Sequence, residues 1–157
     1  MLTSKDSGSI FDEHAEAIVN PVNCVGAACG LAWQFMRKFP EQHARYMECC
    51  SNQALVPGTI LVCTSYRDDG SRLHVVYFPT KSHWGLRSQL KSIRSGLDAL
   101  ESYAIRAELA SLALPALGCR SGKLSWDTEV LPAITEFSEL PTMKGVAITA
   151  FSPQERG

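Results

Sequence analysis

The sequence predicts a three-layer α/β fold, in which helices cover both faces of a central sheet. Short apolar runs alternate along the chain with longer segments whose apolar residues recur at helical spacing. Gly- and Pro-containing turns separate the two kinds of segment. The chain has 157 residues, a length that suits one domain with one core. We therefore expect a single domain over residues 1–157.

The first half of the chain alternates strands and helices. Apolar runs that end in turn residues predict buried strands. Apolar residues at three- and four-residue spacing predict helices, the first of which is stopped by Pro40. The predicted elements, in chain order, are a strand at Ala17–Asn20, helices at Leu31–Phe39 and Glu41–Ser51, and strands at Thr59–Thr64 and Leu73–Phe78 separated by the turn Arg67–Gly70.

The second half continues this alternation. The longest helical pattern covers Leu86–Tyr103, with its leucines and Ile93 on one apolar face. A first turn rich in Ser, Asp and Glu predicts a last helix at Ser125–Phe137. Apolar runs at Ser111–Leu114 and Gly145–Phe151 are predicted to be strands. In folds of this class ligands bind beyond the carboxyl ends of the strands.

Composition and charge exclude several classes of protein. Hydrophobic residues make up 45% and charged residues 20% of the chain, unlike a disordered protein. The formal net charge is −1, so contact with nucleic acid is expected to be local. No apolar stretch approaches the roughly 18 residues of a membrane span, and the N-terminus lacks the features of a signal peptide. The six cysteines lack zinc-knuckle spacing, so we expect reduced thiols, no metal and a cytoplasmic protein.

Two loops carry the residues that an anionic ligand needs. The first follows the strand at Ala17–Asn20, and its small residues let backbone N–H groups approach a phosphate beside a helix N-terminus. The second also joins a strand to a helix and adds two cations. One such loop alone would be read as an ordinary turn, but two at one sheet edge can hold a diphosphate from both sides. Neither has Walker or dinucleotide-binding spacing. The predicted ligand-binding residues are Asn20, Asn23, Cys24, Gly26, Ala27, Ala28, Cys29, Gly30, Leu31, Thr80, Pro115, Leu117, Gly118, Cys119, Arg120, Ser121 and Gly122.

A third segment leaves a predicted strand at the same edge and contains Lys81, His83 and Trp84. Lys81 can pair with a phosphate, attack a sugar carbon or be a solvated surface group. A lone lysine is most often solvated, and the setting between Phe78 and Trp84 adds weight to the other two roles. His83 and Trp84 can stack on a nucleobase, although Trp84 can equally anchor the segment in the core.

Basic residues follow this segment. Arg87, Lys91 and Arg94 fall at helical spacing and can meet a phosphate backbone or form a solvated face.

These motifs together resemble a macrodomain. The segments that carry the resemblance are Ile18–Gly26, Gly30–Ala32, Gln34–Phe35, Lys38–Pro40, Phe78–Lys81, His83–Trp84, Ser95–Leu97, Pro115–Cys119 and Leu124–Trp126. The likeness runs from about Gly8 to Phe151. The chain is similar to one branch of the macrodomain superfamily. This branch holds the DNA ADP-ribosyl glycohydrolases, which are antitoxins known as DarG, and the terminal ADP-ribose protein glycohydrolases. The resemblance implies an α/β/α macrodomain with a mixed central sheet, and ADP-ribose as the ligand without a further cofactor.

The resemblance also implies roles for single residues. Asn23 matches the asparagine that faces the distal ribose, and the backbone around Gly26 and Gly30 matches the loop that contacts this ribose and the diphosphate. The segment Gly118–Gly122 matches the second diphosphate loop. Lys81 matches a lysine that acts at the anomeric carbon of the distal ribose, in some members through a covalent lysyl adduct. Such a lysine can attack as the neutral amine or assist the leaving group as the cation.

The implied activity is hydrolysis. We expect an enzyme that removes ADP-ribose from a DNA base, thymidine, with acidic protein side chains as second substrates. The alternative is a non-catalytic reader of ADP-ribose. Arg87 joins His83 and Trp84 as an expected contact of the modified DNA or protein. A toxin ADP-ribosyltransferase is a partner known in this branch, although this chain does not itself imply one.

Four positions depart from the family pattern. Ser9 stands where an aspartate commonly bonds the adenine, with Asp6 and Asp12 nearby as alternatives. Cys29 stands where DarG-type members have lysine, and Arg120 and Ser121 replace a more glycine-like loop. The second-loop aspartate of the protein-directed relatives has no counterpart, which favours the DNA-directed mechanism or weak activity.

A different chemistry would use a cysteine. Cys24 or Cys119 could act as a nucleophile with a histidine as base. Both are more readily interpreted as small residues that line the cleft.

Overall fold

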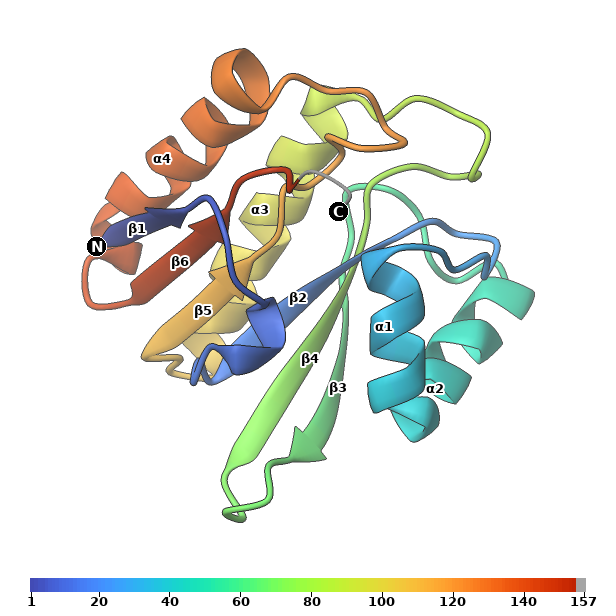
Figure 1. The fold of residues 1–157 in the computed structure, drawn as a ribbon, viewed down its shortest axis with the longest axis horizontal. Coiled ribbons are helices and arrows are strands. Elements are labelled where there is room, and N and C mark those ends of the chain that lie inside the picture. The colour runs from blue at the N-terminus through green and yellow to red at the C-terminus, as the bar shows by residue number, and fades with distance from the viewer. Residues whose placement is uncertain (155–157) are drawn as a thin grey trace.

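The computed structural model describes residues 1–154 and confirms the three-layer α/β/α architecture (Figure 1). The described strands form a six-stranded sheet with the order β1-β6-β5-β2-β4-β3. The β3–β4 pair is antiparallel and the other pairs are parallel, so the sheet is mixed as expected. The strands are β1 (Leu2–Lys5), β2 (Ala17–Val22), β3 (Leu61–Tyr66), β4 (Arg72–Pro79), β5 (Ser111–Leu114) and β6 (Ala147–Phe151).

Two helices cover each face of the sheet. One apolar cluster packs α1 and α2 against Ile18, Val22 and neighbouring residues. The other packs α3 and α4 against Ala17 and Val19, which alternate with the first pair along β2. The helices are α1 (Leu31–Lys38), α2 (Pro40–Ser51), α3 (Leu90–Arg106) and α4 (Leu131–Glu139), with short helical turns η1 (Ile10–Asp12), η2 (Trp126–Val130) and η3 (Pro141–Met143).

The strand β2 is the centre of the fold. It pairs with β4 on one side and with β5 on the other. Because helices cover both faces of the sheet, nearly all residues of β2 are buried, whichever face their side chains are on. The carboxyl ends of β2, β4, β5 and β6 therefore lie at one edge of the sheet (Figure 1).

A glycine sets how closely α3 approaches the sheet. A Cβ added at Gly96 would lie 2.3 Å from Cζ of the buried Phe78 on β4. Only a residue without a side chain allows this contact, because a packed core has no space for the shift that a methyl group needs. The contact fixes the end of β4 from which Lys81 follows.

The predicted helix at Leu86–Tyr103 begins later than expected. Gln89 is its N-cap, and α3 starts at Leu90. Arg87 therefore lies in the segment before the helix, so the prediction that it shares a helix face with Lys91 and Arg94 is wrong. Arg94 is paired with Glu136 on α4 rather than left for a ligand. The apolar spacing already begins at Leu86, before the true helix start at Leu90, because periodicity alone does not mark where a helix begins.

Other boundaries moved by a few residues. The strands predicted from Thr59 and Gly145 begin at Leu61 and Ala147. The helix predicted from Ser125 opens with the π-helical turn η2, whose N-cap is Ser125, before α4 begins. The strand β1 was not predicted, because four residues at a sheet edge with mostly exposed side chains give little pattern.

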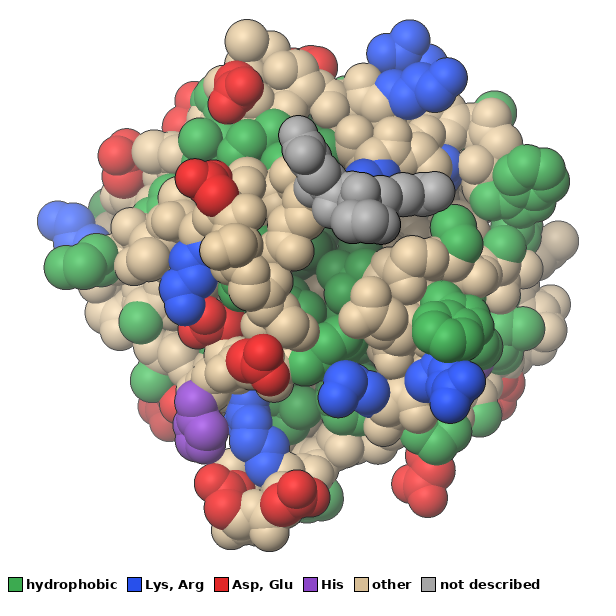
Figure 2. All heavy atoms as spheres, viewed as in Figure 1, with side chains coloured by type: hydrophobic (Ala, Val, Ile, Leu, Met, Phe, Trp, Pro, Cys, Tyr) green, Lys and Arg blue, Asp and Glu red, His purple; other side chains and the backbone are tan. Residues whose placement is uncertain are grey.

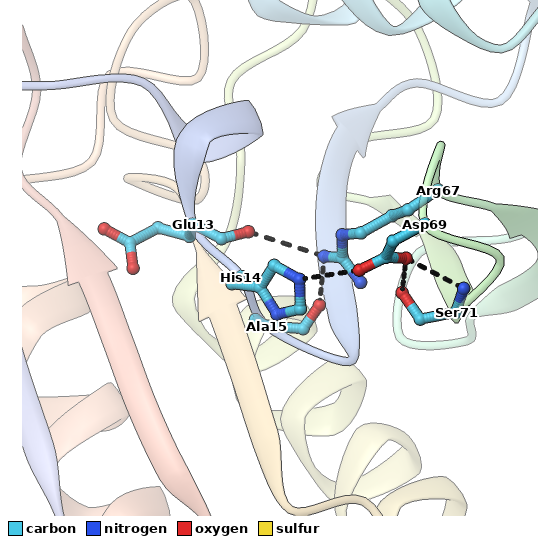
Figure 3. Close-up of polar contacts among 6 residues, drawn as sticks. All are labelled: Glu13, His14, Ala15, Arg67, Asp69 and Ser71. Carbon is cyan, nitrogen blue, oxygen red and sulfur yellow. Dashed lines mark hydrogen bonds and ion pairs between the residues drawn. The ribbon is translucent and has the colours of Figure 1, made fainter.

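A hairpin closes the opposite end of the sheet. The turn between β3 and β4 contacts the backbone before β2 through Arg67, which donates to the carbonyl oxygens of Glu13 and Ala15 (Figure 3). His14 faces Asp69 at 3.4 Å. Asp69 also accepts hydrogen bonds from the backbone N–H and hydroxyl of Ser71.

Candidate functional site

A cleft opens at the carboxyl ends of the strands and has a volume of about 640 Å³. Three loops form most of it: the first loop (Asn23–Gly30, between β2 and α1), the second loop (Pro115–Ser125, between β5 and η2) and the lysine segment (Thr80–Gln89, between β4 and α3). The segments Gly8–Ile10 and Phe151–Gln154 complete the wall.

The structure brings together most of the residues that the sequence predicted for ligand binding. Those in the cleft wall are Asn23, Ala27, Cys29, Gly30, Leu31, Thr80, Lys81, Pro115, Gly118, Arg120, Ser121 and Gly122. Those outside the wall are Asn20, Cys24, Gly26, Ala28, Leu117 and Cys119.

Asn20 lies within the fold rather than in the cleft wall. Its side chain is on the same face of β2 as Ile18 and Val22, and it is almost fully buried. Among the described residues its amide group has no hydrogen-bond partner, and neither has the hydroxyl of Tyr77, its neighbour in register on β4.

Asn23 folds the first loop around itself. Its side-chain amide donates to the carbonyl of Ala27 at 3.0 Å, and its side-chain oxygen accepts from the backbone N–H groups of Val25 and Ala27 at 3.0 and 3.3 Å. The buried hydroxyl of Tyr46 on α2 donates to the Asn23 carbonyl at 2.7 Å. Tyr46 was not predicted from the sequence, because nothing local links it to a residue 23 positions earlier.

Positive φ angles at two glycines shape the first loop. Gly26 has φ of +82° and Gly30 has φ of +57°, a region that L side chains rarely adopt. Gly30 is the N-cap of α1, so the free N–H groups of the first helical turn begin directly beside the cleft. These are the donors that a phosphate needs.

The second loop packs tightly against the lysine segment. The backbone N–H of Ser88 donates to the carbonyl of Gly122 at 3.0 Å. A Cβ added at Gly122 would lie 2.2 Å from the Ser88 hydroxyl oxygen and 2.5 Å from the carbonyl oxygen of Gly118. Gly122 is thus required by close approach, and the second loop and the lysine segment form one wall of the cleft.

Lys81 reaches from the end of β4 to the second loop. The residue is 7% exposed, and its amine donates to the carbonyl of Trp84 at 2.8 Å and to the hydroxyl of Ser121 at 3.0 Å. Burial lowers the pKa of Lys81, Cys29 acts in the opposite direction, and the charge of Lys123 lowers the pKa further. None of the four ion pairs found over residues 1–154 includes Lys81.

Arg120 extends across the mouth of the cleft. Its guanidinium donates to the carbonyl of Gln154 at 3.0 Å, and one of its nitrogens lies 3.7 Å from where a Cβ of Gly30 would be. Gln154 in turn donates to the carbonyl of Gly8 at 2.8 Å. Arg120 therefore joins the second loop to the N-terminus of α1 and to the wall formed by the two chain ends.

Apart from Ser9, the residues of the wall at Gly8–Ile10 and Phe151–Gln154 were not predicted from the sequence to lie at the site. This wall exists because β1 pairs with β6, a pairing that the sequence did not predict. Ser9 caps η1 by accepting from the N–H of Phe11 at 3.2 Å, and Asp6 accepts from the Ser152 hydroxyl at 2.9 Å. Both side chains are therefore engaged within the protein.

Exposed aromatic and basic side chains lie on α1 and the lysine segment, two of the segments that contribute residues to the cleft. Trp84 is 62% exposed, so it does not anchor the lysine segment in the core, and its ring lies 5.1 Å from that of His83. Trp33 on α1 is 45% exposed and carries the guanidinium of Arg37 over its ring. Arg87 donates to the carbonyl of Lys123 at 3.4 Å. Figure 2 shows hydrophobic and basic groups gathered over α1 and the lysine segment.

Neither Cys24 nor Cys119, the two cysteines that could act as nucleophiles, is activated. All six are free thiols. Burial raises the pKa of Cys24 to about 11 and that of Cys119 to about 12, so both stay protonated and unreactive near neutral pH. Over residues 1–154 there is no group of His, Cys, Asp and Glu that could hold a metal ion. In the same part of the chain no helix is long and apolar enough to cross a membrane.

Comparison with known proteins identifies the fold family. The Macro domain family model matches residues 19–131. The DNA ADP-ribosyl glycohydrolase of Mycobacterium tuberculosis is 36% identical over 141 residues, which cover 89% of this chain and 40% of that protein. The protein of the same name from Thermus aquaticus is 34% identical over 152 residues, which cover 94% of this chain and 40% of that protein. The chain thus spans about 40% of the length of these curated relatives.

Solved structures give the same result. The macrodomain of Mycobacterium tuberculosis DarG superposes with a TM-score of 0.91 at 33% identity, covering 98% of this chain and 99% of that one. Thermosipho africanus DarTG in complex with ADP-ribose superposes with a TM-score of 0.83 at 26% identity, covering 96% of this chain and 41% of that one.

Proposed function

The chain belongs to the macrodomain family, and on this premise we propose that it binds ADP-ribose in the cleft and hydrolyses the bond that joins ADP-ribose to a modified macromolecule. The observation that carries the proposal is the buried amine of Lys81, held at the wall of a cleft whose loops offer free backbone donors. The matched relatives named DNA ADP-ribosyl glycohydrolase support the same activity.

The two loops would hold the diphosphate between them. The N-terminus of α1 supplies backbone N–H groups on one side, and the second loop supplies a small-residue backbone on the other. Arg120 adds a planar cation at the mouth, and a guanidinium binds phosphate oxygens strongly because it can donate two parallel hydrogen bonds. The volume of about 640 Å³ is in the range of clefts that hold ligands of this size.

Lys81 would act at the anomeric carbon of the distal ribose. A lowered pKa increases the share of neutral amine, which is the form that can attack. Attack forms a carbon–nitrogen bond and breaks the bond to the leaving base, which departs with the bonding electrons and takes a proton from water. Water then adds to the same carbon, releases ADP-ribose and regenerates the amine.

A DNA base is the substrate that the cleft supports best. No Asp or Glu is found among the described residues of the cleft wall, so the carboxylate that assists catalysis in protein-directed relatives has no equivalent there. The exposed Trp84 and Trp33 with their cationic neighbours suit unpaired bases, which stack on aromatic rings. We therefore propose thymidine-linked ADP-ribose as the main substrate and ADP-ribosylated acidic side chains as the second.

The partner and location follow from this substrate. A relative from Thermosipho africanus is named a DNA ADP-ribosyl transferase–DNA ADP-ribosyl glycohydrolase fusion protein and is 30% identical over 134 residues. We propose that a transferase of that kind makes the modification that this protein removes, and that both act in the cytoplasm.

A side-by-side hydrolysis assay tests the proposal. Thymidine-linked ADP-ribosyl DNA and glutamate-linked ADP-ribosyl protein are offered to the wild type and to Lys81→Ala. We expect faster release from DNA, and at least roughly a hundredfold loss in the variant, because removing a nucleophile removes its covalent step. Calorimetry should show that Lys81→Ala still binds ADP-ribose. Unchanged turnover in Lys81→Ala would remove this lysine from the mechanism, and wild-type binding without turnover on either substrate would identify a reader module.

A further inference from the structure

The amine of Lys81 has two protein acceptors that come from different loops. One is the backbone carbonyl of Trp84, three residues along the lysine segment, and the other is the hydroxyl of Ser121, forty residues away on the second loop. The bond between the Lys81 amine and the Ser121 hydroxyl therefore joins the lysine segment to the second loop.

Two acceptors fix the orientation of a tetrahedral nitrogen. A neutral amine has two N–H bonds and one lone pair, beside its bond to carbon. When both N–H bonds are held by Trp84 and Ser121, the lone pair has one direction left, because the two hydrogen bonds remove rotation about the last carbon–nitrogen bond. Lys81 and Ser121 both line the cleft.

We propose that Ser121 is a positioning residue that holds the Lys81 amine in the orientation needed for attack on the sugar. This inference rests on the proposed function, in which Lys81 is the group that reacts. Without the hydroxyl, the amine keeps one acceptor and can rotate about its terminal bond, so fewer encounters have the correct geometry.

The surroundings hold Ser121 at the required place. The Ser88 N–H bonds the carbonyl of Gly122, the residue next to Ser121, and Arg87 bonds the carbonyl of Lys123. The backbone on the C-terminal side of Ser121 is thus fastened to the segment that carries Lys81. The Ser121 side chain itself is exposed, so its removal takes no packing from the core.

The test uses four variants of the chain: Ser121→Ala, Ser121→Thr, Lys81→Ala and the double variant Lys81→Ala with Ser121→Ala. Ser121→Ala should lower kcat on ADP-ribosyl DNA by roughly tenfold to a hundredfold, as expected for a misplaced reacting group. KM and the Kd for free ADP-ribose should stay within about twofold of the wild type, because only the reacting orientation is lost. Ser121→Thr keeps the hydroxyl and should recover most of the rate.

The double variant and a control complete the comparison. In the Lys81→Ala background, Ser121→Ala should have no further effect, because the hydroxyl acts through the amine. The control is Ser82→Ala, which removes an exposed serine of the lysine segment that makes no side-chain hydrogen bond within residues 1–154. It should match the wild type.

A readout that needs no turnover separates this inference from the proposed function. In chains labelled with nitrogen-15 lysine, the Lys81 amine protons should exchange slowly with solvent in the wild type and in Ser82→Ala, and quickly in Ser121→Ala. An unchanged exchange rate, an unchanged kcat, or a rise in Kd as large as the fall in kcat/KM would overturn the positioning role. Wild-type turnover by Lys81→Ala would instead contradict the proposed function.

Discussion

At the hairpin end of the sheet, charged side chains bond to one another and to the backbone, whereas at the cleft end they carry no counter-charge. Arg67 donates to two carbonyl oxygens and Asp69 accepts from Ser71 and His14 (Figure 3). At the cleft end, Lys81 and Arg120 contact only neutral acceptors among the described residues. Polar groups satisfied within the protein contribute to the fold, and cations left unneutralised at a concave site are available to an anionic ligand.

The pKa shifts at the hairpin end and the cleft end of the sheet have different causes. Hydrogen bonds from Ser71, with a further contribution from His14, lower the pKa of Asp69 to about 2, because they stabilise its charge. Burial lowers the pKa of Lys81, because it disfavours its charge. The first shift reflects a stabilised charge and the second a charge that burial disfavours, and only the second increases the share of the reactive neutral form.

The pH dependence of the rate is the largest effect that this comparison predicts. If the neutral amine reacts, kcat should rise by about tenfold per pH unit below the pKa of Lys81, and level off before the ordinary lysine value of 10.5. Burial is the main cause of the lowered pKa and so sets where the rate levels off, with smaller contributions from Cys29, which raises the pKa, and Lys123, which lowers it. Single-turnover rates across the range measure the profile.

Stability should stay independent of Asp69 over the same range. The contribution of its depressed pKa to stability is present above the ordinary value of 3.8 and is lost only as the pH falls toward about 2.

The control for the pH dependence of the rate is Lys81→Arg, which cannot become neutral and should show no rise of rate with pH. A rate that falls as the pH rises would mean that the cation assists the leaving group.

Replacing either of two glycines by alanine tests the comparison through the space that the new Cβ would occupy. Gly122→Ala should weaken ADP-ribose binding by at least about tenfold and lower the free energy of unfolding by about 1–3 kcal/mol, because its Cβ would meet Ser88 and the backbone of Gly118. Gly145→Ala has no heavy atom within 4 Å of the new Cβ, so its free energy of unfolding should stay within about 0.5 kcal/mol of the wild type. Calorimetry and thermal unfolding measure both. Full affinity in Gly122→Ala would show that the second loop can move aside.

Two arginines give the smallest effects, one on ligand binding and the other on stability. Arg120→Ala should raise the Kd for ADP-ribose by roughly tenfold with little change in Tm, because it removes one charge-assisted contact. Arg67→Ala should leave Kd unchanged and lower the free energy of unfolding by about 1–2 kcal/mol, because it removes bonds to two carbonyl oxygens. Equal Kd values in the wild type and Arg120→Ala would place the guanidinium outside the binding site.

Much of the frame could be predicted because it depends on local pattern. The strand β5 begins and ends as predicted, and β2 and α1 differ from the prediction only at one end. The first and second loops were found because small residues directly after a buried strand are visible in the sequence itself. Lys81 was singled out because it follows β4, and parallel strands end at one edge.

The remaining features depend on segments that are distant in sequence. The wall made by the two chain ends was missed because β1 is short and its partner β6 lies some 145 residues away. The true start of α3, and with it the place of Arg87, was missed because an apolar spacing continued into the preceding segment. Tyr46 was missed because its hydroxyl serves a loop that belongs to another element.

Short-range patterns were enough to predict the alternation of strands and helices, the two small-residue loops and the lysine that follows β4, because periodicity and turn chemistry act over a few neighbouring residues. The burial of this amine, its bonds to Ser121 and to the Trp84 carbonyl, and the place of Arg120 at the cleft mouth are visible only in the folded chain. Burial and hydrogen-bond partners depend on which loops meet in space, and no local pattern specifies that meeting.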